Sequence, residues 1–397
     1  MNAIAEINAF SDEMSAIRRD IHAHPEVGYD VHRTADLVAS KLEEWGLQVT
    51  RGVGRTGVVG TLKRGNSERA IGLRADMDAL PMQEANVFEH RSTHPGAMHA
   101  CGHDGHTAML LGAARYLAKS GYFSGTVQFF FQPAEEAGAG AQAMIEDGLF
   151  ERFPVEAVFG VHNWPGIPEG HFAVTPGPIM ASTNPFKITL TGAGCHGAMP
   201  HLGTDPVFAA AQIVSLLQSI LTRNKNPVES AALSVTQIHG GEAQNVVPTT
   251  AWLGGTVRAF SEDTLDLIET RMRAIVSSTA LGLGCKSDVE FCRIYPPTIN
   301  DAEQTAFAVN VMREVVGEQN VNASITPTMA SEDFSFMLKA KPGCYAFLGN
   351  GDGKHRDTGH GEGPCLLHNA SYDFNDKLLP IGSTYFVRLV ERFLDHE

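Results

Sequence analysis

The stretch MHACGHDGHTAM holds more metal-ligating residue types than any other part of the chain: His99, Cys101, His103, Asp104 and His106 lie within eight positions. Thiolate, imidazole and carboxylate groups are the usual ligands of zinc and related metals. In an extended segment, side chains two positions apart point in a similar direction, so Cys101 and His103 can reach one metal cluster. Two other interpretations compete. One is a polar loop with unrelated histidines, and the other is a nucleophilic Cys101 with His103 as its base.

Two adjacent carboxylates, Glu135 and Glu136, follow the apolar run FFFQP and precede a glycine-rich turn. Open α/β sheets place their sites at the carboxyl ends of their strands. Because neighbouring side chains diverge, one glutamate can bind metal while the other faces the substrate and acts as general base. Adjacent glutamates are also common on surface helices, so this pair alone is a weak signal. It indicates a catalytic role because it follows FFFQP and occurs together with the Cys-His stretch.

Two further histidines stand at positions where a ligand is expected. His162, in FGVHNWPG, ends another apolar run, and His368, in LLHNASYDFND, follows an apolar pair in an expected loop. A histidine at a strand end can equally be structural. Taken alone, a single loop histidine such as His368 is weak evidence for metal binding.

The elements expected around these residues alternate between strands and helices. Helices are expected at 11–24, with Ser11 as N-cap, at 34–45 and at 105–119, and strands at 56–62, 70–75, 125–131 and 156–162. This alternation predicts an α/β fold with a mostly parallel sheet.

The pattern changes near residue 182. A strand carrying Phe186, Ile188 and Leu190 is followed by a helix that opens with Asp205 and Pro206. Strands at 230–238, 251–260 and 286–294 and a helix at 262–280 complete a β-α-β-β-α-β order, which is the ferredoxin-like unit. Because α/β signals resume after Pro297 and end in a helix at about 380–394, we expect domain 182–294 to interrupt a domain made of 1–181 and 295–397.

Composition argues against nucleic acid or an anionic membrane as the main partner. The 397 residues include 45 acidic and 30 basic side chains, for a net charge of −15, whereas nucleic acids and anionic membranes select basic surfaces. We find no signal-peptide pattern and expect no membrane-spanning helix. Six cysteines without close pairing are typical of reduced thiols, so we expect a cytoplasmic protein.

With these motifs in view, the chain resembles the zinc-peptidase-like amidohydrolases that include hippurate hydrolases, aminoacylases and plant auxin-conjugate hydrolases. The resemblance extends from about residue 18 to residue 376. The matching strings, in the family's order, are RRDIHAHPEVGYD, RADMDALPMQE, MHACGHDGHTAM, QPAEEAGAGA, GVHNWPG, GAGCHGAMPH, NVVPTTAWLGGTVR, SEDFSFML and LHNASYDFND.

The resemblance implies a metal-binding catalytic domain with an inserted ferredoxin-like dimerisation (lid) domain. It also implies two divalent metal ions per subunit, either zinc, manganese, cobalt or nickel, with Cys101 as the bridging ligand. The implied ligands are Cys101, His103, Glu136, His162 and His368. Glu135 is then the general base. Asp78 is implied to orient a metal ligand without contacting the metal itself. The broader clan has a ligating histidine where this chain has Asp76.

Three residues of the lid match functional positions of the family. His196 corresponds to a histidine that reaches the partner subunit's active site and steadies the oxyanion. Asn245 and Arg258 correspond to residues that bind the substrate's carboxylate, a task for which the guanidinium fork is suited. The plainer alternatives are a locally bonded loop histidine and a strand-face salt bridge. A homodimer or a dimer-based homotetramer is expected.

The function predicted from the sequence is metal-dependent hydrolysis of N-acyl amino acids, a small-molecule substrate class. Three alternatives remain. A dipeptidase or carboxypeptidase would use the same two-metal site. A binding protein on a degenerate enzyme fold is disfavoured because Glu135 and every expected ligand are present. A cysteine hydrolase acting through Cys101 would differ in its resistance to chelators.

Overall fold

In the computed structural model, residues 3–136, 138–356 and 358–395 are described, and the chain divides into two units. Unit 1 comprises Met1–Ile179, Ile299–Thr326 and Asp333–Glu397. Unit 2 comprises Met180–Thr298 and the short segment Pro327–Glu332. The sequence had suggested an insertion of 182–294, and nothing in it had suggested the short return segment.

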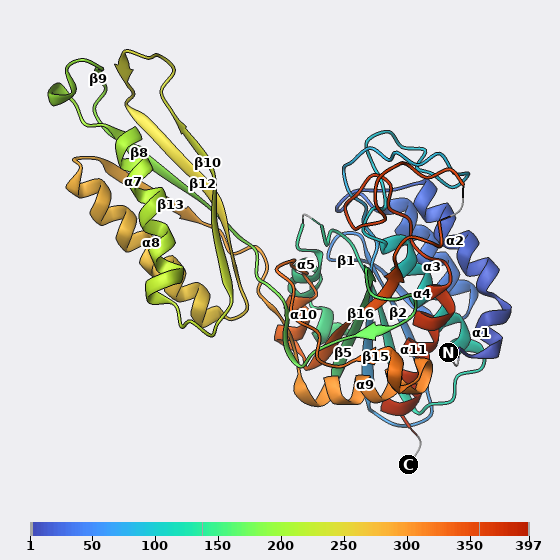
Figure 1. The fold of residues 1–397 in the computed structure, drawn as a ribbon. Helices are drawn as coiled ribbons and strands as arrows, with labels where there is room; N and C mark the ends of the chain where they lie inside the picture. Colours follow the sequence, from blue (N-terminus) through green and yellow to red (C-terminus); the bar gives the residue numbers. More distant parts are fainter. Residues whose placement is uncertain (1–2, 137, 357, 396–397) are drawn as a thin grey trace. The chain divides into compact units, whose positions relative to one another are not determined.

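Unit 1 is built on an eight-stranded sheet with the order β1-β2-β4-β3-β5-β16-β6-β15 (Figure 1). The strands are β1 (Gln48–Val53), β2 (Gly57–Arg64), β3 (Ala70–Asp76), β4 (Gly125–Gln132), β5 (Ala157–Pro165), β6 (Phe172–Ala173), β15 (Val321–Asn322) and β16 (Gly343–Gly351). The central strands β4, β3, β5 and β16 are parallel, whereas β1 and β2 are antiparallel additions at one edge. The predicted α/β class and mostly parallel sheet are confirmed.

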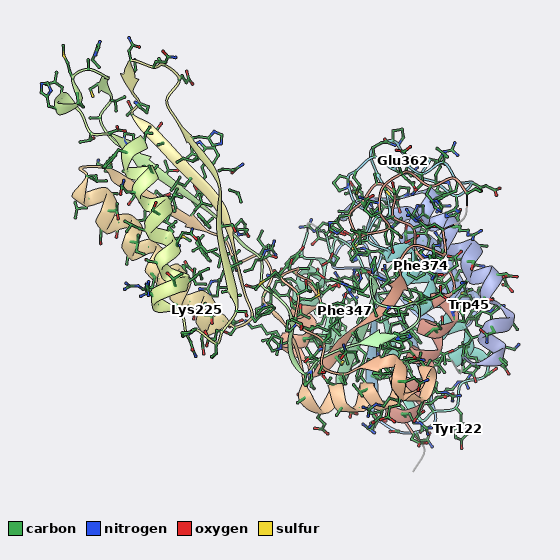
Figure 2. The ribbon with its side chains drawn as sticks, in the orientation of Figure 1. Trp45, Tyr122, Lys225, Phe347, Glu362 and Phe374 are labelled. Carbon is green, nitrogen blue, oxygen red and sulfur yellow. The ribbon has the colours of Figure 1, made fainter. Side chains whose placement is uncertain are left out.

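Helices cover both faces of this sheet (Figure 1). They are α1 (Ala5–Ala9), α2 (Ser11–Ala23), α3 (His32–Glu44), α4 (His103–Lys119), α5 (Gly140–Glu146), α6 (Leu149–Arg152), α9 (Ala302–Val316), α10 (Ser335–Ala340) and α11 (Leu378–Phe393), with a 3-10 turn at Glu318–Asn320. The alternation of strand side chains separates the faces. Phe129 and Phe131 join the core formed with α4 and α11, whereas Phe130 lies against Phe150 of α6. Side chains such as Phe347 and Phe374 fill the interior of unit 1 (Figure 2).

One local prediction was wrong, and some elements were not predicted. Helix α2 begins at Ser11 itself, and its N-cap is Phe10, because the Ser11 hydroxyl donates to the carbonyl of Asn8 instead of capping the helix. No range was predicted for several elements, among them helices α1, α5, α6, α9 and α10 and strands β1, β6, β15, β16, β7 (Gly177–Met180) and β14 (Thr298–Asn300). Strand β1 reads QVTRGV, whose polar residues are tolerated at the sheet edge where one side has no neighbouring strand.

Unit 2 has the ferredoxin-like order that was predicted. Its elements are β8 (Asn184–Thr191), α7 (Pro206–Ser219), β10 (Ala231–Gly240), β12 (Thr250–Ala259), α8 (Glu262–Gly282) and β13 (Lys286–Phe291), and its sheet order is β10-β12-β8-β13. The Asp205 carboxylate accepts hydrogen bonds from the backbone amides of Val207 and Phe208, which confirms it as N-cap of α7. Short strands β9 (Cys195–His196) and β11 (Val246–Val247) pair at one end of the unit, and β7 (Gly177–Met180) pairs with β14 (Thr298–Asn300).

One stretch, Pro206–Asn224, is long and apolar enough to cross a membrane by length and composition, which the sequence analysis had not expected. It comprises α7 and the π-helical turn Ile220–Asn224. Its side chains Ile213, Leu217 and Ile220 are fully buried in the core of unit 2. Packing against the sheet therefore accounts for part of its apolar composition, since 33% of the stretch is buried.

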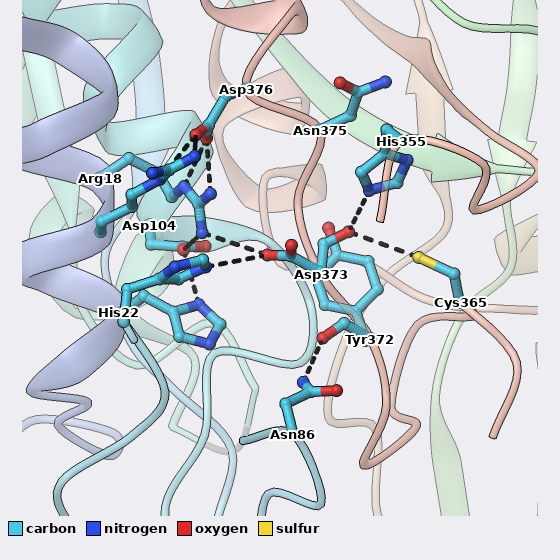
Figure 3. A network of polar contacts seen from close by, with 12 residues as sticks. Arg18, His22, Asn86, Asp104, His355, Cys365, Tyr372, Asp373, Asn375 and Asp376 are labelled. Carbon is cyan, nitrogen blue, oxygen red and sulfur yellow. Dashed lines mark hydrogen bonds and ion pairs between the residues drawn. The ribbon is translucent and has the colours of Figure 1, made fainter. Parts of the chain in front are cut away.

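A buried network of charges ties α2 to the C-terminal part of unit 1 (Figure 3). Arg18 is 1% exposed, and its guanidinium bonds Asp376 at 2.6 Å and Asp373 at 3.2 Å and lies 3.6 Å from Asp104. His22 bonds Asp104 at 2.9 Å and Glu84 at 3.2 Å. Burial alone would lower the pKa of His22, but these two carboxylates outweigh it and raise the pKa to about 9.

We expect Arg18→Met to destabilise the protein strongly. The substitution leaves several buried carboxylates without their cation, a loss worth about 3–5 kcal/mol when one partner of a buried pair is removed. Arg51→Met is the matched control, because Arg51 is 42% exposed and pairs only with exposed carboxylates, where a pair contributes about 0–1 kcal/mol. Urea unfolding measures both variants. Equal destabilisation would show that the buried network contributes no more than a surface pair.

Candidate metal centre and active site

The Cys-His stretch lies at the start of α4 because of a single backbone conformation. Gly102, the residue before the helix, has φ = 91°, a left-handed value that glycine adopts without strain. A Cβ at this position would lie 2.2 Å from Oδ1 of Asn163 and 2.6 Å from the hydroxyl of Tyr372. Glycine is therefore required between Cys101 and His103, and the turn directs both side chains into the interior of unit 1, where each is buried.

The predicted ligands come together in unit 1 although they are distant in sequence. Ligand atoms within 4.8 Å of one another form one group of Cys101, His103 and His162, and a second group of Cys101, Glu136 and His368. Cys101 is common to both groups, as a bridging ligand must be. The Cys101 sulfur lies 3.4 Å from Nε2 of His162, and Nε2 of His368 lies 3.3 Å from Oε1 of Glu136. Ligands about 2.0–2.3 Å from a tetrahedral zinc are separated by roughly 3.3–3.8 Å.

The donor set fits a cation. Among the described residues, both ring nitrogens of His103 and Oε1 of Glu136 are buried without a hydrogen-bond partner. Buried polar atoms are rarely left unpaired in native proteins. Burial alone would lower the pKa of the His103 imidazole. The carboxylates of Asp76, Asp78 and Glu136 outweigh this effect and raise the pKa to about 10. The surrounding carboxylates thus favour a positive charge at this point, which a divalent metal ion would supply.

The electrostatics of Cys101 disfavour a cysteine hydrolase. Burial and the carboxylates of Glu136 and Glu135 raise the pKa of the Cys101 thiol well above its usual value. The histidine in contact with its sulfur, His162, has a pKa lowered by burial and by His106. A neutral thiol beside a neutral imidazole is not the thiolate–imidazolium pair of a cysteine nucleophile.

Asp78 holds the turn that carries the two glutamates. Its two carboxylate oxygens accept hydrogen bonds from the backbone amides of Glu135 at 3.0 Å and Glu136 at 3.1 Å, and Oδ1 lies 3.4 Å from Nδ1 of His103. One side chain thereby fixes the glutamate pair relative to a candidate ligand. The turn needs this support, because Ala134 and Ala139 have φ values of 53° and 51°, in a region costly for residues other than glycine.

Glu135 is 6% exposed, and its Oε1 accepts a hydrogen bond from the backbone amide of Asp333 at 3.3 Å. The Asp333 carboxylate in turn accepts bonds from Gln132, at the end of β4, and from the backbone amide of Ala141, in α5. Asp333 therefore holds both ends of the turn as well as the glutamate itself. The sequence analysis contained Asp333 in the matching string SEDFSFML but gave it no role.

A second buried set that had no predicted role lies beneath the ligands. His106 bonds Asp76 at 2.6 Å and Oδ1 of Asn163 at 2.7 Å, and Asn163 donates to the hydroxyl of Tyr372 at 2.5 Å. These residues come from β3, α4, β5 and the C-terminal loop, so they join the elements that carry His103, His162 and His368. The density of polar residues in HDGH and SYDF was the only signal in the sequence that could have indicated them.

The three lid residues are divided between two ends of unit 2. His196 is exposed and pairs across β9 and β11 with Val246, and the adjacent Gly197 amide donates to the carbonyl of Asn245. Arg258 lies near the opposite end of β12, eight residues from Thr250, which corresponds to about 26 Å along a strand. The structure brings His196 and Asn245 together and separates Arg258 from both.

Comparison with known proteins gives one consistent result. Residues 72–392 match the family model described as peptidase family M20/M25/M40. The hippurate hydrolase of Campylobacter jejuni is 43% identical over 99% of this chain and 100% of its own length. The thermostable carboxypeptidase 2 of Saccharolobus solfataricus is 37% identical over 98% of this chain and 97% of its own length. The crystal structure of the Bacillus subtilis YXEP protein, a dinuclear metal binding peptidase, is 32% identical, covers 98% of this chain and 99% of its own, and superposes with a TM-score of 0.83.

The chain therefore belongs to peptidase family M20/M25/M40. Within it, the chain is a metal-dependent amidohydrolase, as its resemblance to the hippurate hydrolases had implied.

Removal of the metal tests the donor set directly. Chelation should abolish activity and lower the thermal unfolding midpoint, because a ligand that binds only the folded state stabilises it. Cys101→Ser should lower the metal content of purified protein, since a neutral hydroxyl replaces a thiolate. Cys344→Ser is the matched control, because Cys344 is equally buried but belongs to no candidate group. Equal metal content in the two variants would contradict the assignment.

Proposed function

We propose that this protein hydrolyses the amide bond of N-acyl amino acids, releasing a carboxylate and a free amino acid. The observation that carries the proposal is the pair of ligand groups that share Cys101, beside the buried carboxylate of Glu135. Hippurate is an N-acyl amino acid, so the Campylobacter relative named for its hydrolysis supports the same substrate class here.

Two divalent ions per subunit would be held by Cys101, His103 and His162 on one side and by Cys101, Glu136 and His368 on the other. The dinuclear Bacillus subtilis structure supports this number. Thiolate, imidazole and carboxylate together suit zinc, manganese, cobalt or nickel. When bound, the ions polarise the scissile carbonyl and offset the negative charge that develops on its oxygen.

Glu135 is the proposed general base. Its carboxylate takes a proton from the attacking water and then gives that proton to the departing amine. Asp333 and Asp78 hold it in place through the backbone amide bonds described above. A base that accepts and returns one proton must stay in a single position through both steps, and these two bonds restrict its movement.

Arg258 is the proposed partner of the substrate's free carboxylate. It is half-buried, and within the described parts of the chain its guanidinium bonds only the hydroxyls of Thr183 and Ser331 and pairs with no carboxylate. A charged group that is partly desolvated without a counterion is well suited to bind an anion. This local charge is needed because the chain as a whole is strongly acidic.

His196 and Asn245 would complete the site from a second subunit. If these two residues and Arg258 all contact one substrate, the separation of about 26 Å along β12 prevents one copy of unit 2 from providing all three. A homodimer removes this conflict, with Arg258 acting in its own subunit and His196 and Asn245 acting in its partner. His196 would then donate to the oxygen on which charge develops.

The surface of unit 2 supports self-association. Strand β10 lies at an edge of the sheet, and most of its side chains from Ser234 onward are exposed. Apolar side chains are exposed on this strand and on α7: Ile238, Phe208 and Leu216 are 54%, 52% and 43% exposed. An edge strand beside apolar side chains can pair with its own copy. A dimer-based tetramer would use further surfaces.

A carboxypeptidase is the second candidate. The Saccharolobus relative carries that name, and peptides cleaved at their C-terminus also present a free α-carboxylate beside the scissile amide. We also propose that the protein works in the cytoplasm, which is consistent with all six cysteines being free.

A substrate panel with one variant tests the proposal. Wild-type protein should hydrolyse N-benzoyl and N-acetyl amino acids faster than dipeptides or C-terminally blocked analogues. Glu135→Gln should keep its metal but lose at least ~10²–10⁴-fold in turnover, because an amide cannot transfer the proton. Glu156→Gln is the control, since Glu156 is 48% exposed and precedes the amino end of β5, whereas His162 lies towards the carboxyl end of that strand. Near-normal turnover by Glu135→Gln with full metal content would refute the assignment of the base.

Mixing two inactive proteins tests the dimer. After subunit exchange between His196→Ala and Glu135→Gln, one site of a mixed dimer combines an intact Glu135 with the partner's intact His196. Activity should rise towards half the wild-type value per mixed dimer, and exchange between two batches of His196→Ala should give no increase. If exchange is demonstrated by mass and no activity returns, His196 does not act across the dimer.

A further inference from the structure

The chain passes between the two units four times, and one of these crossings lies between two contacts that matter for catalysis. The crossing falls between Glu332 and Asp333. On one side, the hydroxyl of Ser331 accepts a hydrogen bond from Nη1 of Arg258 at 3.1 Å. On the other, the backbone amide of Asp333 donates to Oε1 of Glu135 at 3.3 Å. Segment 331–333 thus begins at the proposed carboxylate-binding residue and ends at the proposed base.

Only one residue, Glu332, separates Ser331 from Asp333. Consecutive Cα atoms are 3.8 Å apart, so the Cα atoms of Ser331 and Asp333 are separated by at most about 7 Å. Glu332, between them, is 1% exposed, which leaves it little freedom to rearrange. A change in the position of Ser331 can therefore be transmitted to the Asp333 amide through a single intervening residue.

The Asp333 end is firmly held in unit 1. Its carboxylate is fully buried and accepts from Nε2 of Gln132 at 2.7 Å, from Arg74 at 3.1 Å and from the backbone amide of Ala141 at 2.9 Å. Gln132 precedes the glutamate turn and Ala141 follows it. Asp333 is consequently part of the same rigid group as Glu135.

The Ser331 end is held more weakly. Ser331 is half-buried and follows the exposed residue Ala330. Its contact with Arg258 is a single bond to a neutral hydroxyl, and the guanidinium has no carboxylate partner within the described residues. A substrate carboxylate would fix the guanidinium by charge-assisted bonds, which are about twice as strong as neutral ones. Binding of the carboxylate would therefore also fix the hydroxyl of Ser331.

We propose that segment 331–333 positions Glu135 in response to carboxylate binding at Arg258, so that the substrate's carboxylate increases kcat as well as affinity. The proposal rests on the proposed function, because it takes Glu135 as the base and Arg258 as the carboxylate-binding residue. Ser331 and Asp333 are positioning residues: they touch Arg258 and Glu135, not the reacting atoms. Binding energy from the substrate's carboxylate, which is remote from the scissile bond, would in this way stabilise the transition state and increase kcat.

Thr183 offers a matched control. Its hydroxyl also accepts a hydrogen bond from Nη1 of Arg258. Thr183 lies near a different crossing, between Ile179 and Met180, and its backbone amide bonds the carbonyl of Tyr295 within unit 2. No proposed base or ligand lies near that crossing in the sequence. The connection of Thr183 to segment 331–333 runs only indirectly, through the backbone amide of Ala181, which bonds the carbonyl of Ala330. Loss of the Thr183 hydroxyl should therefore weaken carboxylate binding with a smaller effect on Glu135 than loss of the Ser331 hydroxyl.

The experiment compares Ser331→Ala with Thr183→Ala, using N-benzoylglycine and its carboxamide, N-benzoylglycinamide, as substrates. Thr183→Ala should raise KM for the carboxylate substrate while changing kcat less than twofold. Ser331→Ala should lower kcat for the carboxylate substrate about five- to tenfold, the scale of one hydrogen bond. Its kcat for the carboxamide should fall less, so the ratio of the two kcat values decreases. Ser331→Thr, which keeps a hydroxyl, should restore the ratio.

Metal content and thermal unfolding midpoint are measured for every variant, so that misfolding is recognised. If Ser331→Ala raises only KM, as Thr183→Ala does, Ser331 merely supports Arg258 and the coupling is refuted. An equal loss of kcat on both substrates also refutes the coupling, because the effect of the substitution would then not depend on the substrate's carboxylate. If wild-type protein shows no preference for the carboxylate substrate in kcat/KM, carboxylate recognition itself fails, and the proposed function fails with it.

Discussion

The active-site region depends on one buried carboxylate. Asp78 follows strand β3 and bonds the backbone amides of Glu135 and Glu136, which follow strand β4, while lying 3.4 Å from His103 at the start of α4. Two parallel neighbouring strands and the helix that packs on them are thereby joined at their functional ends. The bonds to two successive amides also hold a turn whose flanking alanines have positive φ values. Without a buried acceptor at this place, that turn would relax and the two glutamates would separate from the other donors.

The sequence predicted the α/β class and the order of unit 2 because those patterns were strong and local, but it gave no range for the central strand β16. Alternating Phe186, Ile188 and Leu190 identified β8, and Asp205-Pro206 identified the start of α7. Ser11 was misassigned because its hydroxyl bonds the preceding short helix, and no feature of SDEM reveals that choice. Strand β1 was missed because its side chains are partly exposed at a sheet edge and lack an apolar pattern.

The candidate site could be predicted only in part, and the physical reason is the same for each omission. Cys101, His103 and the glutamate pair stand in dense motifs, so residue type and spacing indicated them. Asp333 acts mainly through its backbone amide and through a buried carboxylate whose partners come from Arg74, Gln132 and Ala141. Backbone donors have no residue-type signal, and partners this distant in sequence meet only in the folded chain. For the same reason, the distance along β12 between Arg258 and the pair His196–Asn245 became apparent only from the strand register.

The replacement of the clan's ligating histidine by Asp76 can now be understood from its partners. Asp76 is fully buried, bonds Arg74 at 2.8 Å and His106 at 2.6 Å, and lies 3.7 Å from Nε2 of His103. Burial would raise the pKa of this carboxyl group, but His103, Arg74 and His106 outweigh it and hold the pKa well below its ordinary value. Its carboxylate is thus already bonded by a guanidinium and an imidazole, although Asp76, His103 and His106 together also form a candidate metal-binding group. Cys101 and His103, at the start of α4, stand instead in candidate metal-binding groups that His162, Glu136 and His368 complete.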